Sequence, residues 1–418
     1  QLASAFTDNI DAMTSWDVYT NINKNGNPPW GGGGFGTCDG GTCAQARYPS
    51  AVASADFPYA VWNEYTAETT FGSTYGGRAY YSYDSFEWEG DSWGTPVDID
   101  LLWETAAKDQ WSGSAQFSWD DDLDMGVLNA VYDDWTRENS FLFHTEIIEE
   151  GLAIFATEQI AIDATLLGDA GYTTPPALTM NDSGQGAMGV IGLFPGVDPE
   201  YGTCTSDVTC NHVPIFRLTA DHGATWYGPS DGSNEFYFVP DAVFDDIFAT
   251  LVTPTLDNGM WYDYCYNYSE DDGFPFGLGA DVDYDADGTI EEMEVTGSYL
   301  VDDWFSWYDW DIRINNEGDL HIVMSFVPES VEAYFTDHPA AGFYHLTINI
   351  DFLENPGEVN SATGWNWSYL MPGGPTWRYD IDASGYSQIF DSFAQISFAK
   401  DNPNVVWAVM NMAGTSGE

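Results

Sequence analysis

Apolar residues along this chain recur mostly at every second position. Short segments rich in Val, Ile, Tyr, Phe and Trp alternate apolar with polar positions, and Asp, Asn and Gly residues separate the segments. A period of two is typical of β-strands with one buried face, and the separating residues are those that favour tight turns. The pattern therefore predicts an all-β protein in which helix is a minor component.

Two strand–turn–strand patterns alternate along the chain. The first, called the inner hairpin, has an alternating strand, a polar turn and a more apolar strand, and the second, called the outer hairpin, follows it. Inner hairpins are predicted at Tyr48–Tyr65, Ala115–Tyr132, Ala177–Phe194, Asp311–Phe326 and Gln395–Met410. Outer hairpins are predicted at Arg78–Trp93, Phe141–Phe155, Ile215–Trp226 and Phe343–Phe352.

One inner and one outer hairpin together make a four-stranded blade, so the repeat predicts a β-propeller of six or seven four-stranded blades. Ser15–Ile22 reads as an orphan strand that completes the last blade and closes the ring, which removes exposed sheet edges. We expect a single domain over 1–418, with a closing strand and Gly-rich loop in 1–47 and an inserted calcium loop in 270–300. Two β-sandwiches with accidental similarity are the alternative.

The net charge of the chain disfavours several classes of binding partner. The sequence of 418 residues has 67 Asp and Glu against 9 Lys and Arg, for a formal net charge of −58. Such a field repels phosphate backbones and anionic lipid heads, so we expect no nucleic-acid partner and no membrane insertion. With 44% hydrophobic and 16% aromatic residues, the chain has enough apolar surface to fold, and its acidic surface calls for bound or atmospheric cations.

The cysteines and the N-terminus favour an extracellular protein. Cys38 and Cys43 form one close pair and Cys204 and Cys210 another, both in Gly-, Thr-, Ser- and Asp-rich loops, whereas Cys265 stands alone. We predict two local disulfides, with reduced thiols in a cytosolic protein as the alternative. The N-terminal segment has neither a basic region nor an apolar core of a signal peptide, so Gln1 is expected to be a mature terminus.

One eight-residue segment matches the Asp-box motif [S/T]-x-D-x-G-x-T-W at every defined position. The matching residues are Thr219, Asp221, Gly223, Thr225 and Trp226. Here the chain resembles the secreted bacterial Asp-box (BNR) propellers, a group that includes sialidases, and Asp84–Trp93 looks like a degenerate copy. The resemblance implies a structural role: the Asp carboxylate accepts backbone N–H bonds, the Gly takes a positive φ, and the Trp packs between blades.

The resemblance does not extend to sialidase chemistry. A sialidase binds its anionic substrate with three arginines, and this chain has Arg47, Arg78, Arg137, Arg217, Arg313 and Arg378 without the early Arg-Ile-Pro signature. A charge of −58 also disfavours an anionic substrate. A hydrolase of neutral polysaccharides needs only two carboxylates at a suitable spacing, but the sequence does not nominate the pair.

A second motif predicts bound Ca²⁺. The segment from Asp283 to Glu294 fits the loop D-x-D-x-D-G-x-I-x3-E, which resembles an EF-hand or dockerin loop. The expected ligands are Asp283, Asp285, Asp287, Thr289, Glu291 and Glu294. The flanking residues are not those of amphipathic helices, so we expect a calcium loop set in a β-hairpin that stabilises the fold, with an acidic solvated turn as the alternative.

Other metal, nucleophile and cofactor motifs are missing from the sequence. The six histidines are scattered without metal-binding spacing, which disfavours zinc, and there is no G-x-S-x-G, P-loop or dinucleotide fingerprint. Aromatic clusters at Trp261–Tyr268, Trp304–Trp310 and Trp365–Tyr369 suggest either sugar stacking at a propeller mouth or packing between blades.

These features favour a secreted, calcium-stabilised, acidic β-propeller on or near a bacterial cell surface. Because the strong motifs are all architectural, we predict a non-catalytic binding or cell-surface assembly module, whose partner is a glycan or another cell-surface protein. The alternative is a glycoside hydrolase or lyase with its active site in a central pocket, which a convergent carboxylate pair would favour. A homo-oligomer or filament is a third hypothesis.

Overall fold

A computed structural model of the chain describes part of its residues. The described residues are 2–6, 16–20, 22–23, 37–38, 41–42, 46–66, 76–89, 93–100, 110–134, 139–156, 159–162, 176–194, 211–230, 236–251, 260–267, 294–301, 303–330, 333–334, 340–353, 362–372, 378–381, 387–390, 394–399 and 402–410. The chain divides into two compact units. Unit 1 holds Gln1–Val190 and Phe216–Gly228, and unit 2 holds Ile191–Ile215 and Pro229–Glu418.

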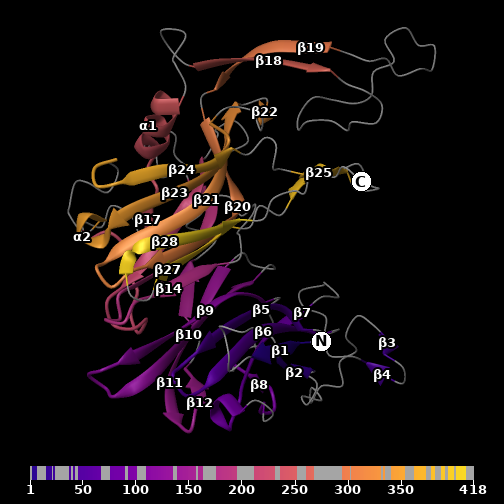
Figure 1. The fold of residues 1–418 in the computed structure, drawn as a ribbon, viewed down its shortest axis with the longest axis vertical. Helices are drawn as coiled ribbons and strands as arrows, with labels where there is room; N and C mark the ends of the chain where they lie inside the picture. The colour runs from indigo at the N-terminus through magenta and orange to yellow at the C-terminus, as the bar shows by residue number, and fades with distance from the viewer. Residues whose placement is uncertain are drawn as a thin grey trace. The chain divides into compact units, whose positions relative to one another are not determined.

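Unit 1 begins with a four-stranded antiparallel sheet in the order β5-β6-β7-β8, drawn in indigo in Figure 1. Its strands are β5 (Ala46–Ala53), β6 (Pro58–Thr66), β7 (Gly76–Tyr83) and β8 (Val97–Asp98). The 3-10 turn η1 (Glu87–Glu89) lies between β7 and β8. Successive residues of β6 and β7 are buried in two different clusters, Tyr59 and Tyr81 in one and Trp62 and Tyr80 in the other, so this sheet is covered on both sides.

A second antiparallel sheet of unit 1 has the order β12-β11-β10-β9, with β13 paired to β11. Its strands are β9 (Gln110–Asp120), β10 (Met125–Asp134), β11 (Asn139–Glu149), β12 (Leu152–Phe155) and β13 (Gln159–Ile162). Three further hairpins pair β1 (Ala3–Phe6) with β2 (Asp17–Thr20), β3 (Thr37–Cys38) with β4 (Gly41–Thr42), and β14 (Ala177–Met180) with β15 (Gly186–Phe194). The strand β16 (Asn211–Thr219) leads into the segment of the Asp-box motif.

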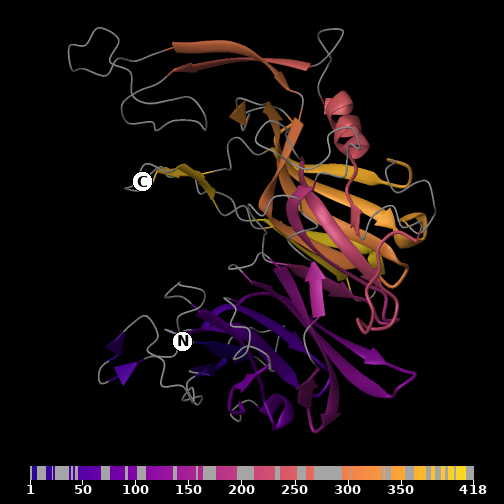
Figure 2. The same cartoon turned by 180° about the vertical axis from the view of Figure 1, so that it is seen from behind.

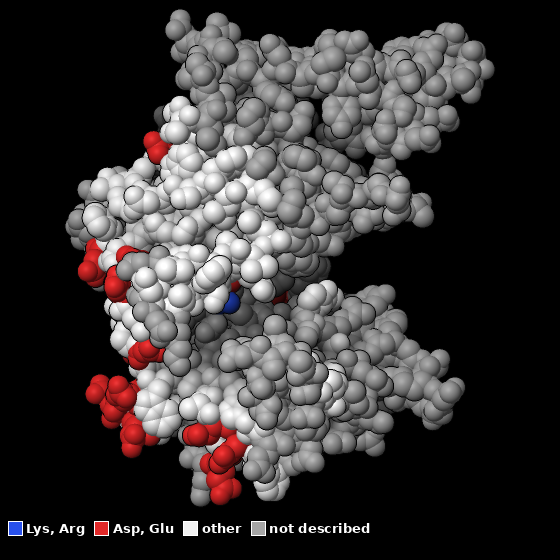
Figure 3. All heavy atoms as spheres, in the orientation of Figure 1, with Lys and Arg blue, Asp and Glu red and all other residues white. Residues whose placement is uncertain are grey.

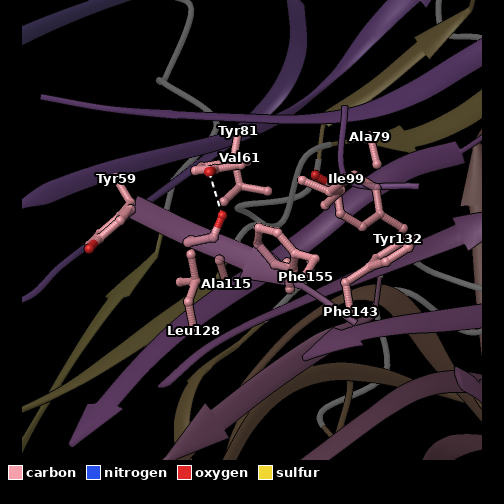
Figure 4. Packing of buried hydrophobic residues seen from close by; sticks show 12 residues of the cluster. Tyr59, Val61, Ala79, Tyr81, Ile99, Ala115, Leu128, Tyr132, Phe143 and Phe155 are labelled. Atoms are coloured by element: carbon pink, nitrogen blue, oxygen red, sulfur yellow. Dashed lines mark hydrogen bonds between the residues drawn. The ribbon is translucent and has the colours of Figure 1, made fainter. Parts of the chain in front are cut away.

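The two sheets of unit 1 share a core of aromatic side chains (Figure 4). Tyr59, Tyr81, Tyr132 and Phe143 are among its members and are at most 1% exposed. The hydroxyl of Tyr81 donates to the carbonyl oxygen of Ala153 at 2.6 Å, so it leaves no unsatisfied polar group in the core. Each ring of this size stabilises the fold by about 2–3 kcal/mol through burial, which fixes the two sheets against each other.

The largest sheet segment of unit 2 has the strand order β20-β21-β23-β24, seen from the front and from behind in Figures 1 and 2. These strands are β20 (Asp303–Ile314), β21 (Asp319–Ser330), β23 (Gly342–Asn349) and β24 (Asn366–Pro372), and β22 (Ala333–Tyr334) pairs with β21. Separate hairpins pair β18 (Met260–Asn267) with β19 (Glu294–Val301), β25 (Arg378–Ile381) with β26 (Ser387–Phe390), and β27 (Ala394–Ala399) with β28 (Asn402–Met410). The strand β17 is Tyr237–Phe238.

Two helices belong to unit 2, α1 (Asp241–Leu251) and α2 (Ile350–Leu353). Helix α1 buries the face formed by Val243, Phe244 and Ile247, which are spaced at one turn of a helix. The ring of Phe244 contacts Phe326 edge-on, with centroids 5.3 Å apart. This contact holds α1 against β21.

The described strands confirm the predicted all-β, β-propeller-type fold class built of four-stranded antiparallel sheets. Each predicted inner hairpin is present, for example β5–β6 at Tyr48–Tyr65 and β20–β21 at Asp311–Phe326. The number of blades, the closure of the ring and a single domain over 1–418 stay predictions. The predicted closing segment Ser15–Ile22 holds β2, which pairs with β1.

One predicted outer hairpin is wrong. Phe343–Phe352 does not fold back on itself: β23 ends at Asn349, α2 follows, and the partner strand is β24, which begins at Asn366. The side chain of Asn349 accepts the N–H of Asp351 at 3.1 Å and so caps the start of α2. Ile350 and Leu353 are both buried, which is the spacing of a helical turn rather than of a strand.

The described acidic residues lie largely at the surface. Figure 3 shows Asp and Glu in red on the described surface of one face, with little blue from Lys and Arg. Among the described residues, no helix has the length and apolar character that crossing a bilayer requires.

Candidate functional site

Polar side chains lie close together at one end of the first sheet of unit 1. We call this set the Asp98 network, and its members are Glu64, Arg78, Asp98, Asp100 and Gln110. The antiparallel register places Glu64 on β6 opposite Arg78 on β7, and Tyr80 opposite Asp98 on β8. The next sheet contributes Gln110, the first residue of β9. Residues that are distant in the sequence are therefore brought together by strand pairing.

An ion pair lies at the centre of the Asp98 network. Arg78 donates from Nη2 at 2.5 Å and from Nε at 3.0 Å, both to Oδ2 of Asp98. The Arg78 side chain is 4% exposed and that of Asp98 is 22% exposed, so the pair is largely removed from water but the carboxyl group still reaches the surface.

Burial has the largest effect on the pKa of Asp98. Loss of hydration raises the pKa of the Asp98 carboxyl to about 6, although Arg78 and the N–H of Asp100 act to lower it. The negative charge of Asp100 adds to the increase. A carboxyl group that holds its proton to about pH 6 is suited to donate it in general acid catalysis near neutral pH.

A chain of hydrogen bonds joins Asp98 to a second carboxylate. The N–H of Asp100 donates to Oδ1 of Asp98 at 3.1 Å, and Nε2 of Gln110 donates to Oδ2 of Asp100 at 2.8 Å. Oε1 of Gln110 in turn accepts the N–H of Ala79 at 3.2 Å. The chain ties β7, β8 and β9 together, so both carboxylates are held in fixed positions.

Glu64 and two aspartates add buried acidity at this end of the sheets. Oε2 of Glu64 accepts Nε1 of Trp62 at 3.0 Å and Nδ2 of Asn23 at 3.3 Å. Asp133 and Asp134, at the end of β10, are both 0% exposed, and Asp134 pairs in register with Gln110. Burial of this many acidic groups is costly without compensation, and such arrangements are concentrated at functional sites.

The segment of the Asp-box motif forms a compact turn after β16. Oδ1 of Asp221 accepts the N–H of Thr225 at 2.9 Å and the hydroxyl of Thr219 at 2.8 Å, and Oδ2 accepts the hydroxyl of Thr225 at 2.6 Å. Burial alone would raise the pKa of Asp221, but these hydrogen bonds outweigh it and lower the pKa. Gly223 has φ +88°, and Trp226 packs against buried residues of unit 1 that include Leu142.

Most residues of the predicted calcium loop and of the predicted disulfides lie outside the described residues. Asp283, Asp285, Asp287, Thr289 and Glu291 lie outside the described residues, and Glu294 is the first residue of β19, opposite Asn267 on β18. Cys43, Cys204 and Cys210 also lie outside them, and Cys38 ends β3. Within the described part of the chain, His, Cys, Asp and Glu side chains form no group that could hold a metal ion. Trp304 and Trp310 are at most 9% exposed, so these two rings serve packing in unit 2.

The Asp98 network was not predicted from the sequence. Its members come from four segments and are joined by register, which a motif search does not detect. The local signal in the sequence is the acidic pair Asp98 and Asp100, which flanks the buried Ile99.

A pocket of about 510 Å³ opens elsewhere in unit 1 and is lined by β1, β5 and the residues around η1. Among the described lining residues, Asp84 contributes the one carboxylate, and Trp88 and Trp93 contribute two indole rings. Asp84 follows Tyr80 on β7 by four residues, and at about 3.3 Å per residue it lies roughly 13 Å along the strand from the position paired with Asp98. The pocket and the Asp98 network are thus two separate sites.

Comparisons with known proteins find similarity of fold only. No family model matches the chain, and no curated protein matches it. Solved structures that match include an α-L-arabinofuranosidase from Podospora anserina, with 10% identity, a TM-score of 0.34, and coverage of 81% of this chain and 71% of the other. A GH62 α-L-arabinofuranosidase from Coprinopsis cinerea matches with 9% identity, a TM-score of 0.35, and coverage of 89% and 86%. A sialidase from Trypanosoma rangeli matches with 11% identity, a TM-score of 0.30, and coverage of 79% and 48%.

These comparisons correct one prediction. The solved structures that match include GH62, GH32 and sialidase enzymes, whereas the prediction from the sequence was a non-catalytic binding or cell-surface assembly module. That prediction is wrong, and the alternative of a glycoside hydrolase is the better supported of the two. The recognisable motifs of the sequence are architectural, and the lack of a catalytic motif was the ground for predicting a non-catalytic module.

Proposed function

We propose that this protein is a glycoside hydrolase and that Asp98 is its proton donor. The observation that carries the proposal is the Asp98 carboxyl, whose pKa is raised to about 6 by burial while Arg78 and Asp100 hold it in place. A glycosidic oxygen is a poor leaving group until it is protonated. A carboxyl group that is still protonated near pH 6 supplies that proton.

Asp100 is the second carboxylate of the proposed reaction. The N–H of Asp100 donates to Oδ1 of Asp98 at 3.1 Å, which holds the two residues next to each other at the end of β8. Glycosidases use two carboxyl groups about 5–9.5 Å apart, one as proton donor and the other to attack the sugar or to activate a water, and we assign the second role to Asp100. Oδ2 of Asp100 accepts a hydrogen bond from Nε2 of Gln110 at 2.8 Å, which fixes the position of this carboxyl group.

The net charge of the chain limits which class of polysaccharide it can bind. A protein with a net charge of −58 repels anionic chains, which disfavours uronic-acid polysaccharides and sialosides. The same argument disfavours a lyase, because lyases act on uronic acids. We therefore propose a neutral polysaccharide as the substrate.

Three features predicted from the sequence remain part of the proposal. We propose that the enzyme acts outside the cell, that two local disulfides join Cys38 to Cys43 and Cys204 to Cys210, and that Ca²⁺ binds the loop from Asp283 to Glu294. The support is the cysteine spacing and the match to the calcium-loop pattern. A melting temperature that rises in Ca²⁺ and falls in chelator would support the calcium site, and an equal melting temperature in both would contradict it.

A depolymerisation screen tests the function. Wild-type protein, Asp98→Asn and Asp100→Asn are incubated with arabinoxylan, mannan, laminarin and inulin at pH 5 in Ca²⁺ and salt, and released reducing ends are measured. We expect release by wild type and a loss of at least about 100-fold in both variants, which is the usual contribution of a general acid or base. Asp121→Asn, at an exposed turn after β9, is the matched control and should keep full activity. Release that survives in Asp98→Asn, checked for folding by its melting temperature, would contradict the role of Asp98.

A further inference from the structure

We propose that the pocket around Asp84 binds a small organic cation that carries N–H donors. The inference concerns a site separate from the Asp98 network and holds whether or not the chain is a hydrolase. It rests on the lining of the pocket, on one unsatisfied carboxylate oxygen, and on two indole rings beside it.

The pocket has the size and composition of a small-molecule site. Its volume of about 510 Å³ lies within the range typical of ligand pockets. The lining residues are Leu2, Ala3, Ser4, Ala5, Ile22, Pro49, Ser50, Ala51, Val52, Ala53, Pro58, Tyr59, Ala60, Asp84, Trp88 and Trp93. Apart from the carboxylate, the side chains are apolar, aromatic or small hydroxyl groups, so the ligand needs an apolar body.

Asp84 supplies the specific polar contact. The residue is 1% exposed, and its Oδ1 accepts the N–H of Phe86 at 3.0 Å. Oδ2 is buried and accepts no hydrogen bond from any group in the described part of the chain. By contrast, both carboxylate oxygens of Asp221 are satisfied by Thr219 and Thr225. A buried acceptor without a hydrogen bond beside an apolar pocket is costly, and a bound donor that reaches it removes that cost.

The donor that fits best is positively charged. No Lys or Arg is among the described residues that line the pocket, so none of these side chains neutralises Asp84. A charge of −58 on the whole chain raises the local concentration of cations. An ammonium group with N–H donors satisfies the charge and the open oxygen together, whereas a sugar hydroxyl satisfies the oxygen alone.

The two tryptophans favour the same ligand. The indole N–H of Trp88 donates to the carbonyl oxygen of Ala55 at 3.0 Å, which anchors a ring that is 45% exposed at the pocket. Trp93 pairs with Asp84 through an isolated β-bridge and packs against the cluster that contains Leu2 and Ile22. Indole faces attract cations by about 0.5–2 kcal/mol, and they also cover an apolar body. The ligand class is therefore an alkyl- or arylalkylammonium ion.

Calorimetric titration tests this site. The probe is 2-phenylethylammonium chloride, its neutral counterpart is 2-phenylethanol, and both are titrated into the full chain at constant high ionic strength to suppress counterion binding. We expect saturable 1:1 binding of the ammonium ion, at least about tenfold weaker binding of the alcohol, and no change in Asp121→Asn.

Two variants complete the test. In Asp84→Asn the affinity for the ammonium ion should fall by at least about tenfold, and in Trp88→Ala, which leaves the carboxylate in place, it should fall several-fold. Asp84→Asn binding as tightly as wild type would overturn the proposal. So would equal affinity for the alcohol, or binding that does not saturate at one site. If Asp84→Asn does not fold, Trp88→Ala with the alcohol comparison decides the question.

Discussion

Arg78 donates two hydrogen bonds to the same carboxylate oxygen of Asp98, Oδ2, and leaves Oδ1 to the N–H of Asp100. This arrangement holds the carboxyl group firmly without fully compensating its burial, since the pKa of Asp98 is raised to about 6 despite the guanidinium beside it. A group fixed in position but still protonated near pH 6 is what a proton donor requires.

The raised pKa of Asp98 makes stability depend on pH. The folded pKa of about 6 lies above the ordinary value of 3.8, so the contribution of Asp98 is fully present below about pH 4 and is lost as pH rises through 6. The loss amounts to about 3 kcal/mol at most. Because Asn does not ionise, the difference in unfolding free energy between wild type and Asp98→Asn, from urea titrations, should decline from pH 4 to 7. A difference independent of pH would contradict the raised pKa.

Arg78 should control the pH range of activity. Removing its charge in Arg78→Gln takes away the main influence that lowers the pKa of Asp98, so that pKa should rise further. The descending limb of the pH profile of kcat/KM should move to higher pH, while Arg78→Lys, which keeps the charge, should move it less. If the descending limb of the kcat/KM profile did not move in Arg78→Gln, Asp98 would not be the proton donor.

Gly223 should not tolerate a side chain. Its φ is +88°, and an added Cβ would meet Oδ1 of Asn129 at 2.6 Å. Gly223→Ala should therefore destabilise unit 1 by about 2–3 kcal/mol through backbone strain and steric overlap, measured by urea unfolding. Gly94→Ala is the matched control, because a Cβ there meets only the carbonyl oxygen of Tyr83 at 3.6 Å and should change stability by under about 1 kcal/mol. Equal effects of the two substitutions would refute this account of the turn.

A buried histidine pair in unit 2 should make stability depend on pH in the direction opposite to Asp98, with stability lost as pH falls. Nδ1 of His321 lies 2.9 Å from Nε2 of His345, and burial, followed by the charge of His345, lowers the pKa of His321 to about 4. The folded pKa lies below the ordinary value of 6.5, so the contribution to stability is present above pH 6.5 and is lost as pH falls toward 4. Wild type should lose stability relative to His321→Gln over this range. A constant difference in unfolding free energy would show that His321 titrates normally.

Alternation along the strands was enough to predict the hairpins, because the period of two records which face of each strand is buried. It failed where the pairing partner is distant, as at Asn349, where a side-chain cap starts α2 and the next strand begins only at Asn366. Helix α1 lies between the predicted hairpins that begin at Ala177 and Asp311, and its buried Phe244 and Ile247 follow a helical spacing and not the period of two.

The candidate site was harder to predict than the fold. Glu64, Arg78, Asp98 and Gln110 are brought together only by strand register and by hydrogen bonds between sheets, and with 67 acidic residues in the sequence no single one stands out. The property that distinguishes Asp98 is its burial beside Arg78, which exists only in the folded chain. Composition supports the proposed substrate class, because a net charge of −58 disfavours anionic ligands.

The most direct test of the proposed hydrolase is the pH profile of reducing-end release from the polysaccharide that wild-type protein degrades, measured alongside Asp98→Asn. The account predicts that kcat/KM of wild type falls as pH rises through about 6, as the proton of Asp98 is lost, and that Asp98→Asn retains about 1% of the activity or less. Undiminished release by folded Asp98→Asn, or no release by wild type from any neutral polysaccharide in the screen, would contradict it.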